Sequence, residues 1–147
     1  IAVPTMRSFI ENSRIRAASE SLQNGISLAR NEAVRRNERI EFAVLANGWE
    51  VRMPGAVTPL HAASGREGSN GLNLTIGPAG ADRLTYDAFG RVTANADTSA
   101  PITQVDIAST NPPSSSNYRP LRVQIQATGT PRLCNPYVGL GNPAVCL

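Results

Sequence analysis

Lysine is absent from this sequence of 147 residues, because all 14 basic side chains are arginines. The chain therefore cannot supply a P-loop phosphate lysine, the strand lysine of a protein kinase or the Schiff-base lysine of a pyridoxal enzyme. Histidine and cysteine are scarce too, with only His61, Cys134 and Cys146. A metal site built from clustered His and Cys ligands is not expected, and we expect no cofactor. The bias towards arginine is typical of a GC-rich genome, or it reflects selection for guanidinium contacts to phosphate or carboxylate.

The single histidine offers little for catalysis. His61 lies in a stretch, 54–71, that is rich in Gly, Ala, Ser and Pro, with no Cys, Asp or Glu next to it. Such a histidine is usually exposed and inert. Serines and acids are present elsewhere, but the sequence gives His61 no company for a catalytic triad. We therefore expect that the chain is not an enzyme.

Long hydrophobic runs are also missing. The chain opens on Ile1-Ala2-Val3-Pro4, far short of the ~20 apolar residues that cross a bilayer. We expect this fragment to be the end of a longer hydrophobic segment removed from the chain. Pro4 is expected to start or kink a helix at this point.

What the sequence does contain, from Pro4 to about Asn37, is the spacing of one long helix. Apolar residues that recur every three or four positions form one face: Ala18, Leu22, Ile26, Ala29 and Ala33. Pairs of opposite charge at i,i+4 are expected on its other faces: Arg7/Glu11, Arg16/Glu20 and Glu32/Arg36.

This helix is too long for the domain that follows it. Roughly 33 residues make a helix about 50 Å long, whereas a 147-residue globule is roughly 30–35 Å across. The first turns should therefore project, and their apolar residues Met6, Phe9 and Ile10 need a partner. A membrane or other subunits are the expected partners of this helix end, which includes Ile1, Val3 and Pro4.

From Arg39 the pattern changes to short alternating runs between turn residues. Asn47-Gly48 predicts a β-hairpin between Arg39–Ala46 and Trp49–Met53. A loop is predicted over 54–71, and a mobile loop over Ser109–Asn117. The other predicted strands are Leu72–Ile76, Arg83–Asp87, Arg91–Thr93, Ile102–Ala108, Arg119–Thr128 and Pro131–Cys134, with a turn at Phe89-Gly90.

One long helix followed only by strands predicts an α+β fold, with the helix packed on an antiparallel sheet or sandwich. We expect a single domain over 1–147, with the helix in 1–37 and a β-rich part in 39–147. No internal repeat and no second domain are evident.

The two cysteines lie twelve positions apart in a tail rich in Pro and Gly. This spacing is neither CxxC nor a zinc ribbon, so a structural disulfide between Cys134 and Cys146 is expected. It would stabilise the fold by about 3 kcal/mol in the chain-entropy model. A disulfide places the domain in an oxidising compartment, such as a periplasm or the cell exterior.

The basic residues are unevenly distributed along the sequence. Residues 118–147 contain Arg119, Arg122 and Arg132 and no acidic residue. Three charges in thirty residues are consistent with an ordinary solvated surface, but these arginines are the candidates if guanidinium groups have a function here.

Several segments together resemble the GspH/FimT family of type IV pilus minor pilins and type II secretion minor pseudopilins. Residues 9–40 are similar to that family's helix, with Leu28–Val34 as the most specific match. Thr85–Val92 resembles its β-turn, and Leu121–Asn135 resembles its last strand and cysteine turn. The resemblance implies a pilin-like fold over nearly the whole chain.

The resemblance also implies a longer precursor, cut and N-methylated by a prepilin peptidase. The chain would then be the periplasmic domain of a protein anchored in the inner membrane and displayed at the cell surface once assembled in a pilus. Its partners would be other minor pilins and the major pilin, or pseudopilins.

Some family members that act in natural transformation carry an arginine pair before the first cysteine, on a surface that contacts DNA. The matching stretch here is Gly129–Arg132, in which Thr130 replaces one arginine. Arg119 and Arg122 could compensate, since phosphate contacts depend on charge. Three functions follow: a minor pilin that initiates or caps a type IV pilus, a pseudopilin of type II secretion, or a minor pilin that binds double-stranded DNA for uptake. The paired cysteines favour the pilus.

Overall fold

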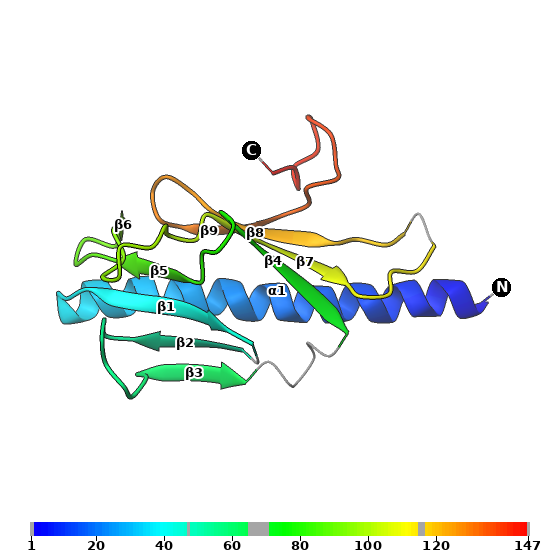
Figure 1. The fold of residues 1–147 in the computed structure, drawn as a ribbon. Coiled ribbons are helices and arrows are strands. Elements are labelled where there is room, and N and C mark those ends of the chain that lie inside the picture. The colour runs from blue at the N-terminus through cyan, green and yellow to red at the C-terminus, as the bar shows by residue number, and fades with distance from the viewer. Residues whose placement is uncertain (1, 47, 65–70, 115–116, 147) are drawn as a thin grey trace.

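A single helix runs the length of the molecule, and two antiparallel sheets pack against it (Figure 1). The computed structural model describes residues 2–46, 48–64, 71–114 and 117–146, with side chains from residue 6 onward. Helix α1 spans Ala2–Arg36, and all strands follow it in the sequence. This arrangement confirms the predicted α+β class. No helix in the described part of the chain has an apolar stretch long enough to cross a bilayer.

The strands form one sheet of five and one of four. The first sheet has the order β3-β2-β1-β5-β6 and consists of β1 (Ile40–Leu45), β2 (Gly48–Arg52), β3 (His61–Ser64), β5 (Arg83–Tyr86) and β6 (Val92–Thr93). The second has the order β4-β7-β8-β9 and consists of β4 (Leu72–Gly77), β7 (Gln104–Ser109), β8 (Leu121–Ile125) and β9 (Pro131–Cys134).

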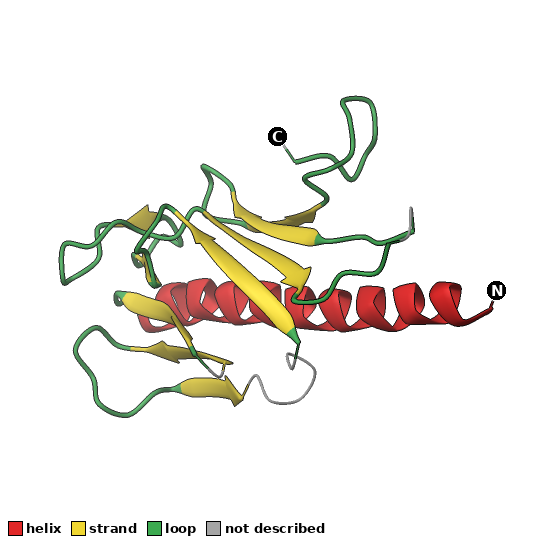
Figure 2. Cartoon of the chain, turned by 45° about the vertical axis from the view of Figure 1, so that its right-hand side comes forward, coloured by secondary structure: helices red, strands yellow, loops and turns green. Residues whose placement is uncertain are grey.

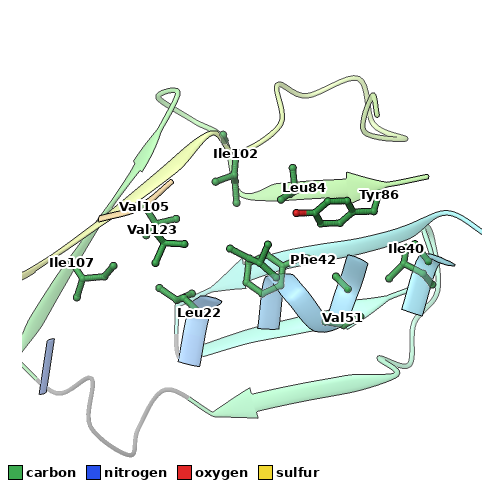
Figure 3. Close-up of a cluster of buried hydrophobic side chains, with 14 of the residues drawn as sticks. Leu22, Ile40, Phe42, Val51, Leu84, Tyr86, Ile102, Val105, Ile107 and Val123 are labelled. Carbon is green, nitrogen blue, oxygen red and sulfur yellow. The ribbon is translucent and has the colours of Figure 1, made fainter. Parts of the chain in front are cut away.

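The predicted apolar face of α1 is the face that meets the sheets. Leu22, Ile26, Ala29 and Ala33 are buried, and Ile15 extends the same face by two turns. Side chains of both sheets reach this one core, as Figure 3 shows for Leu22 among its neighbours: Phe42, Val51, Leu84, Val105 and Val123. The helix therefore holds the two sheets together.

Asn37 ends the helix. Its φ of 55° is left-handed, and its N–H donates to the carbonyl of Val34. The N–H of Glu38 donates to the carbonyl of Ala33. These two bonds are the Schellman arrangement that satisfies the last carbonyls of a helix, in which Asn tolerates the left-handed conformation.

Most of the predicted strands are present, but β3 is not among those the sequence predicts. His61–Ser64 fall in the stretch 54–71 that was expected to be a loop. They pair with β2, with His61 opposite Val51. Their side chains are mostly exposed, so no alternation of apolar and polar residues marks them. Asn47 of the predicted hairpin and residues 65–70 lie outside the described residues.

One of the three predicted helix pairs is wrong. Glu11 pairs with Arg14 at 3.5 Å instead of with Arg7, whose guanidinium donates to the carbonyl of Asn111 at 3.2 Å. The other two form, Arg16 with Glu20 and Arg36 with Glu32. Arg7 is diverted because the segment after β7 passes beside this end of the helix.

Candidate functional site

The N-terminal turns of α1 extend beyond the strands and present an apolar face (Figure 2). Met6 is 62% exposed, Phe9 71% and Ile10 44%. Because residues three and four apart share a helix face, these side chains form one surface. Ile1 lies outside the described residues, as do the side chains of Val3 and Pro4, so the predicted surface is observed only from Met6 onward.

The opposite side of these turns is held by the segment between β7 and β8. The side-chain amide of Asn12 donates to the carbonyl of Asn117 at 2.6 Å, and the N–H of Arg119 donates to the Asn12 side-chain oxygen at 2.8 Å. The sequence predicts a mobile loop over Ser109–Asn117. In the structure Ser109 is the last residue of β7, and the segment contacts the helix through the carbonyls of Asn111 and Asn117. These two residues flank 115–116, which lie outside the described residues. These contacts leave the face of Met6, Phe9 and Ile10 open.

Arg122 does not have a free charge. It lies on β8 directly opposite Asp106 on β7. Its guanidinium donates to both carboxylate oxygens of Asp106, with Nε–Oδ1 at 2.5 Å and Nη2–Oδ2 at 3.0 Å. These hydrogen bonds raise the pKa of Arg122. The segment 118–147 has no acidic residue in its own sequence, but strand pairing supplies one.

The other two candidate arginines make contacts with main-chain carbonyls. Arg132, on β9, donates to the carbonyl of Pro143 at 3.2 Å, inside the disulfide loop. The exposed Arg119 donates to the carbonyl of Tyr118 at 3.1 Å. The three arginines therefore have different local roles: an ion pair, a tether of the C-terminal loop and a contact beside the helix.

Cys134 and Cys146 form a disulfide, with their Cα atoms 5.1 Å apart. The N–H of Asn135 also donates to the carbonyl of Ala144 at 2.7 Å. These links hold a loop that displays Tyr137, 78% exposed, and Leu140, 89% exposed. The loop stands away from the helix at the outer side of the second sheet (Figure 1).

His61 has an acidic neighbour that the sequence analysis missed. Its Nε2 lies 3.5 Å from Oε1 of Glu32, a buried carboxylate on α1. Arg35 and Arg36 donate to the same carboxylate, both at 2.7 Å, and lower the pKa of Glu32 to about 2. Glu32 thus pairs with two arginines at the end of the helix and lies beside His61 of β3. Of these contacts, the sequence analysis predicted only the i,i+4 pair of Glu32 and Arg36.

Among the described residues, no group of three or more His, Cys, Asp or Glu side chains could hold a metal ion. The features that stand out are instead surfaces: the helix face at Met6, Phe9 and Ile10, the disulfide loop, and the turn between β5 and β6. An arrangement of this kind can bind other macromolecules.

The chain matches the model of one protein family, described as type II transport protein GspH, over residues 18–129. A search of curated proteins finds no match. The fold is similar to that of the type IV minor pilin FimU of Pseudomonas aeruginosa, with a TM-score of 0.64 and 19% identity, over 85% of this chain and 91% of that one. It is also similar to the minor pseudopilin EpsH from the type 2 secretion system of Vibrio cholerae, with a TM-score of 0.57 and 17% identity, over 85% of this chain and 99% of that one. At these identities the structural likeness shows the fold alone.

Proposed function

Because the chain belongs to the GspH family of minor pilins and pseudopilins, we propose that it is a minor pilin of a type IV pilus that helps to initiate or cap pilus assembly. The apolar segment expected before Ile1 would anchor it in the inner membrane until it joins the filament. The disulfide between Cys134 and Cys146 supports a periplasmic location, because such bonds persist in oxidising compartments.

The observation that carries the proposal is the exposed apolar face at the start of α1. Met6, Phe9 and Ile10 project where the helix has left the strands. Burial of such a side chain contributes about 1.5–3 kcal/mol, so this face gains when it packs on a partner. In a filament core, helices of neighbouring subunits would cover this whole apolar face.

A comparison of strains tests this function and separates it from secretion. A strain that lacks the gene should make few or no surface pili by electron microscopy, while it still exports the substrates of its type II secretion system. Normal piliation with failed secretion would assign the chain to the pseudopilus instead. Normal results in both assays would reject both.

Variants then test the helix face itself. Phe9→Asp should abolish complementation, because a carboxylate cannot be buried in an apolar filament core. Val57→Asp is the matched control, since Val57 is 98% exposed and far from the helix in sequence. This control should restore piliation. Complementation by Phe9→Asp at the level of the control would contradict the proposed packing.

DNA binding for uptake is the alternative. It would depend on Arg119 and Arg132, because the charge of Arg122 is taken up by Asp106. Duplex DNA titrated against the protein at low and high salt tests it. Micromolar binding that weakens with salt and with Arg132→Gln would support this role. No chemical-shift change at low salt would exclude it.

A further inference from the structure

The turn between β5 and β6 has a conformation that its own side chains fix. Oδ1 of Asp87 accepts the N–H groups of Phe89 at 2.9 Å and Arg91 at 3.0 Å. The main chain closes the same turn, because the N–H of Gly90 donates to the carbonyl of Asp87 at 2.9 Å. These N–H donors, that of Arg91 foremost, lower the pKa of the Asp87 carboxyl. The turn is therefore rigid before any partner arrives.

The rest of the molecule holds this turn from two sides. Nε of Arg30, on α1, donates to the carbonyl of Gly90 at 2.9 Å. Gly90 has a φ of 76°, and a Cβ there would come within 3.2 Å of the side chains of Arg30 and Val34. On the other side, a Cβ at Gly129 would lie 2.7 Å from the Gly90 carbonyl oxygen. Both glycines let the turn lie close to the body of the protein.

This rigid turn displays an aromatic ring that the fold does not use. Phe89 is 77% exposed, and its described ring contact is the guanidinium of Arg91, 5.1 Å from the ring centroid. Val34, which flanks Gly90 on the helix, is 53% exposed. Aromatic residues, Phe included, and arginine are enriched at protein interfaces, and arginine is among the residues enriched where the binding energy concentrates. A preformed turn loses little conformational entropy on binding.

The shape and charge of this surface indicate its partner. Phe89 projects from a turn instead of lining a cavity, so it suits an apolar pocket on another protein better than it suits a small molecule. The carboxylate of Asp87 is occupied by N–H groups and by Arg91. The described partner of the Arg30 side chain is the Gly90 carbonyl, which carries no net charge. The surface is thus apolar with an excess of positive charge, and it fits a pocket edged by carboxylates.

The turn also lies at the opposite end of the molecule from the apolar helix face (Figure 1). Phe9 and Arg30 are separated by about 32 Å along the helix, at 1.5 Å per residue. We propose that Phe89, Arg91 and Val34 form a docking site for the adjoining subunit of the same filament, on the side away from the membrane. This inference rests on the proposed function, because it takes the partner to be a pilin-type subunit.

Photo-cross-linking in cells that make the complete assembly tests this site. The cross-linking amino acid p-benzoylphenylalanine is placed at Phe89, at Phe9 or at Tyr137, which is 78% exposed and so matches Phe89 in exposure. We expect position 89 to give a cross-link to a pilin-type subunit, identified by mass spectrometry, in much higher yield than position 137. Cross-linking at 9 but not at 89 would overturn this site and leave the proposed function standing. Loss of cross-links at both, with normal piliation, would count against the function itself.

A second variant separates docking from folding. Phe89→Ala should leave the thermal midpoint unchanged, because the ring is exposed, yet reduce recovered pili about tenfold as expected for the loss of an interface anchor. Val57→Ala, at an apolar side chain that is even more exposed, at 98%, should have no effect on assembly. Normal assembly with Phe89→Ala, or a cross-link from position 89 to a protein that is not a pilin-type subunit, would refute the proposal.

Discussion

At the scale of single residues, the pair of Arg122 and Asp106 shows how a neighbouring strand decides what a charge can do. The side chain of Arg122 is 24% exposed and that of Asp106 is 32% exposed, so most of each is covered. Arg122→Gln should cost about 1 kcal/mol of unfolding free energy, because Asp106 then loses a two-point partner. In urea melts, Arg122→Gln combined with Asp106→Asn should cost less than the sum of the single variants. Additive losses would show that the pair is not coupled.

Glu32 gives a second prediction at this scale, on acid stability. Its pKa is lowered from 4.5 to about 2, first by the hydrogen bond from Arg35 and then by that from Arg36. The stabilisation is therefore complete above pH ~4.5 and is lost as the pH falls towards 2. Glu32→Gln should cost about 1–2 kcal/mol at pH 7, discounted because Arg35 is largely exposed. The difference between the two proteins in urea melts should shrink steadily below pH 4.5. A difference that is constant with pH would contradict this origin.

The partners of Arg122 and Glu32 also show what could not be predicted from the sequence. An acid-free segment is a property of the chain, but Asp106 reaches Arg122 from 16 positions earlier through the pairing of β7 with β8. His61 has Glu32 beside it only because β3 pairs with β2. Charge partners that are distant in sequence depend on strand register, which composition cannot supply. The disulfide could be predicted, because two cysteines have only one partner each within the chain.

At the scale of elements, Gly25 explains how closely α1 meets the first sheet. A Cβ at this position would lie 2.7 Å from the ring of Trp49 and 2.9 Å from that of Phe42. Gly→Ala inside a helix is ordinarily stabilising by about 1 kcal/mol, but here overpacking should reverse the sign. We expect Gly25→Ala to destabilise the protein by about 1–3 kcal/mol in urea melts.

The first control removes the Trp49 ring that a Cβ at Gly25 would meet. In a Trp49→Ala background, Gly25→Ala should cost less, because the closest ring is gone. Gly139→Ala, where a Cβ would meet nothing within 4 Å, should change stability by less than about 0.5 kcal/mol. A stabilising Gly25→Ala would show that the helix and sheet separate easily at this point.

The helix could be predicted and β3 could not, for a physical reason. The period of Leu22, Ile26, Ala29 and Ala33 reports a face that is buried along its length. An edge strand such as β3 forms through backbone hydrogen bonds to one neighbour and buries little, so its side chains carry no such period. Phe89 also belongs to no periodic pattern, so its exposure could not be predicted from the sequence.

At the scale of the whole molecule, stability is distributed unevenly along α1. From Ile15 to Ala33 one face of the helix is buried against both sheets. Among residues 6–14, only Ser8 is buried, and Arg7 and Asn12 make polar contacts to the segment between β7 and β8. A helix without tertiary packing is marginal in water, so the end that carries Met6, Phe9 and Ile10 is the least stable part of the helix.

Hydrogen exchange measures this distribution directly. Amides of residues 6–14 should exchange through local opening, faster by about a hundredfold or more than those of 15–33, which need global unfolding. Asn12→Ala should speed exchange only in the first group, because it removes the two hydrogen bonds to the segment after β7. Asn24→Ala, at an exposed helix position within the second group, is the control: it makes the same gain in helix propensity and should speed exchange in neither group. Equal protection along the whole helix would mean that the first turns are stable alone. The proposed packing would then add contacts to a preformed helix without also ordering it.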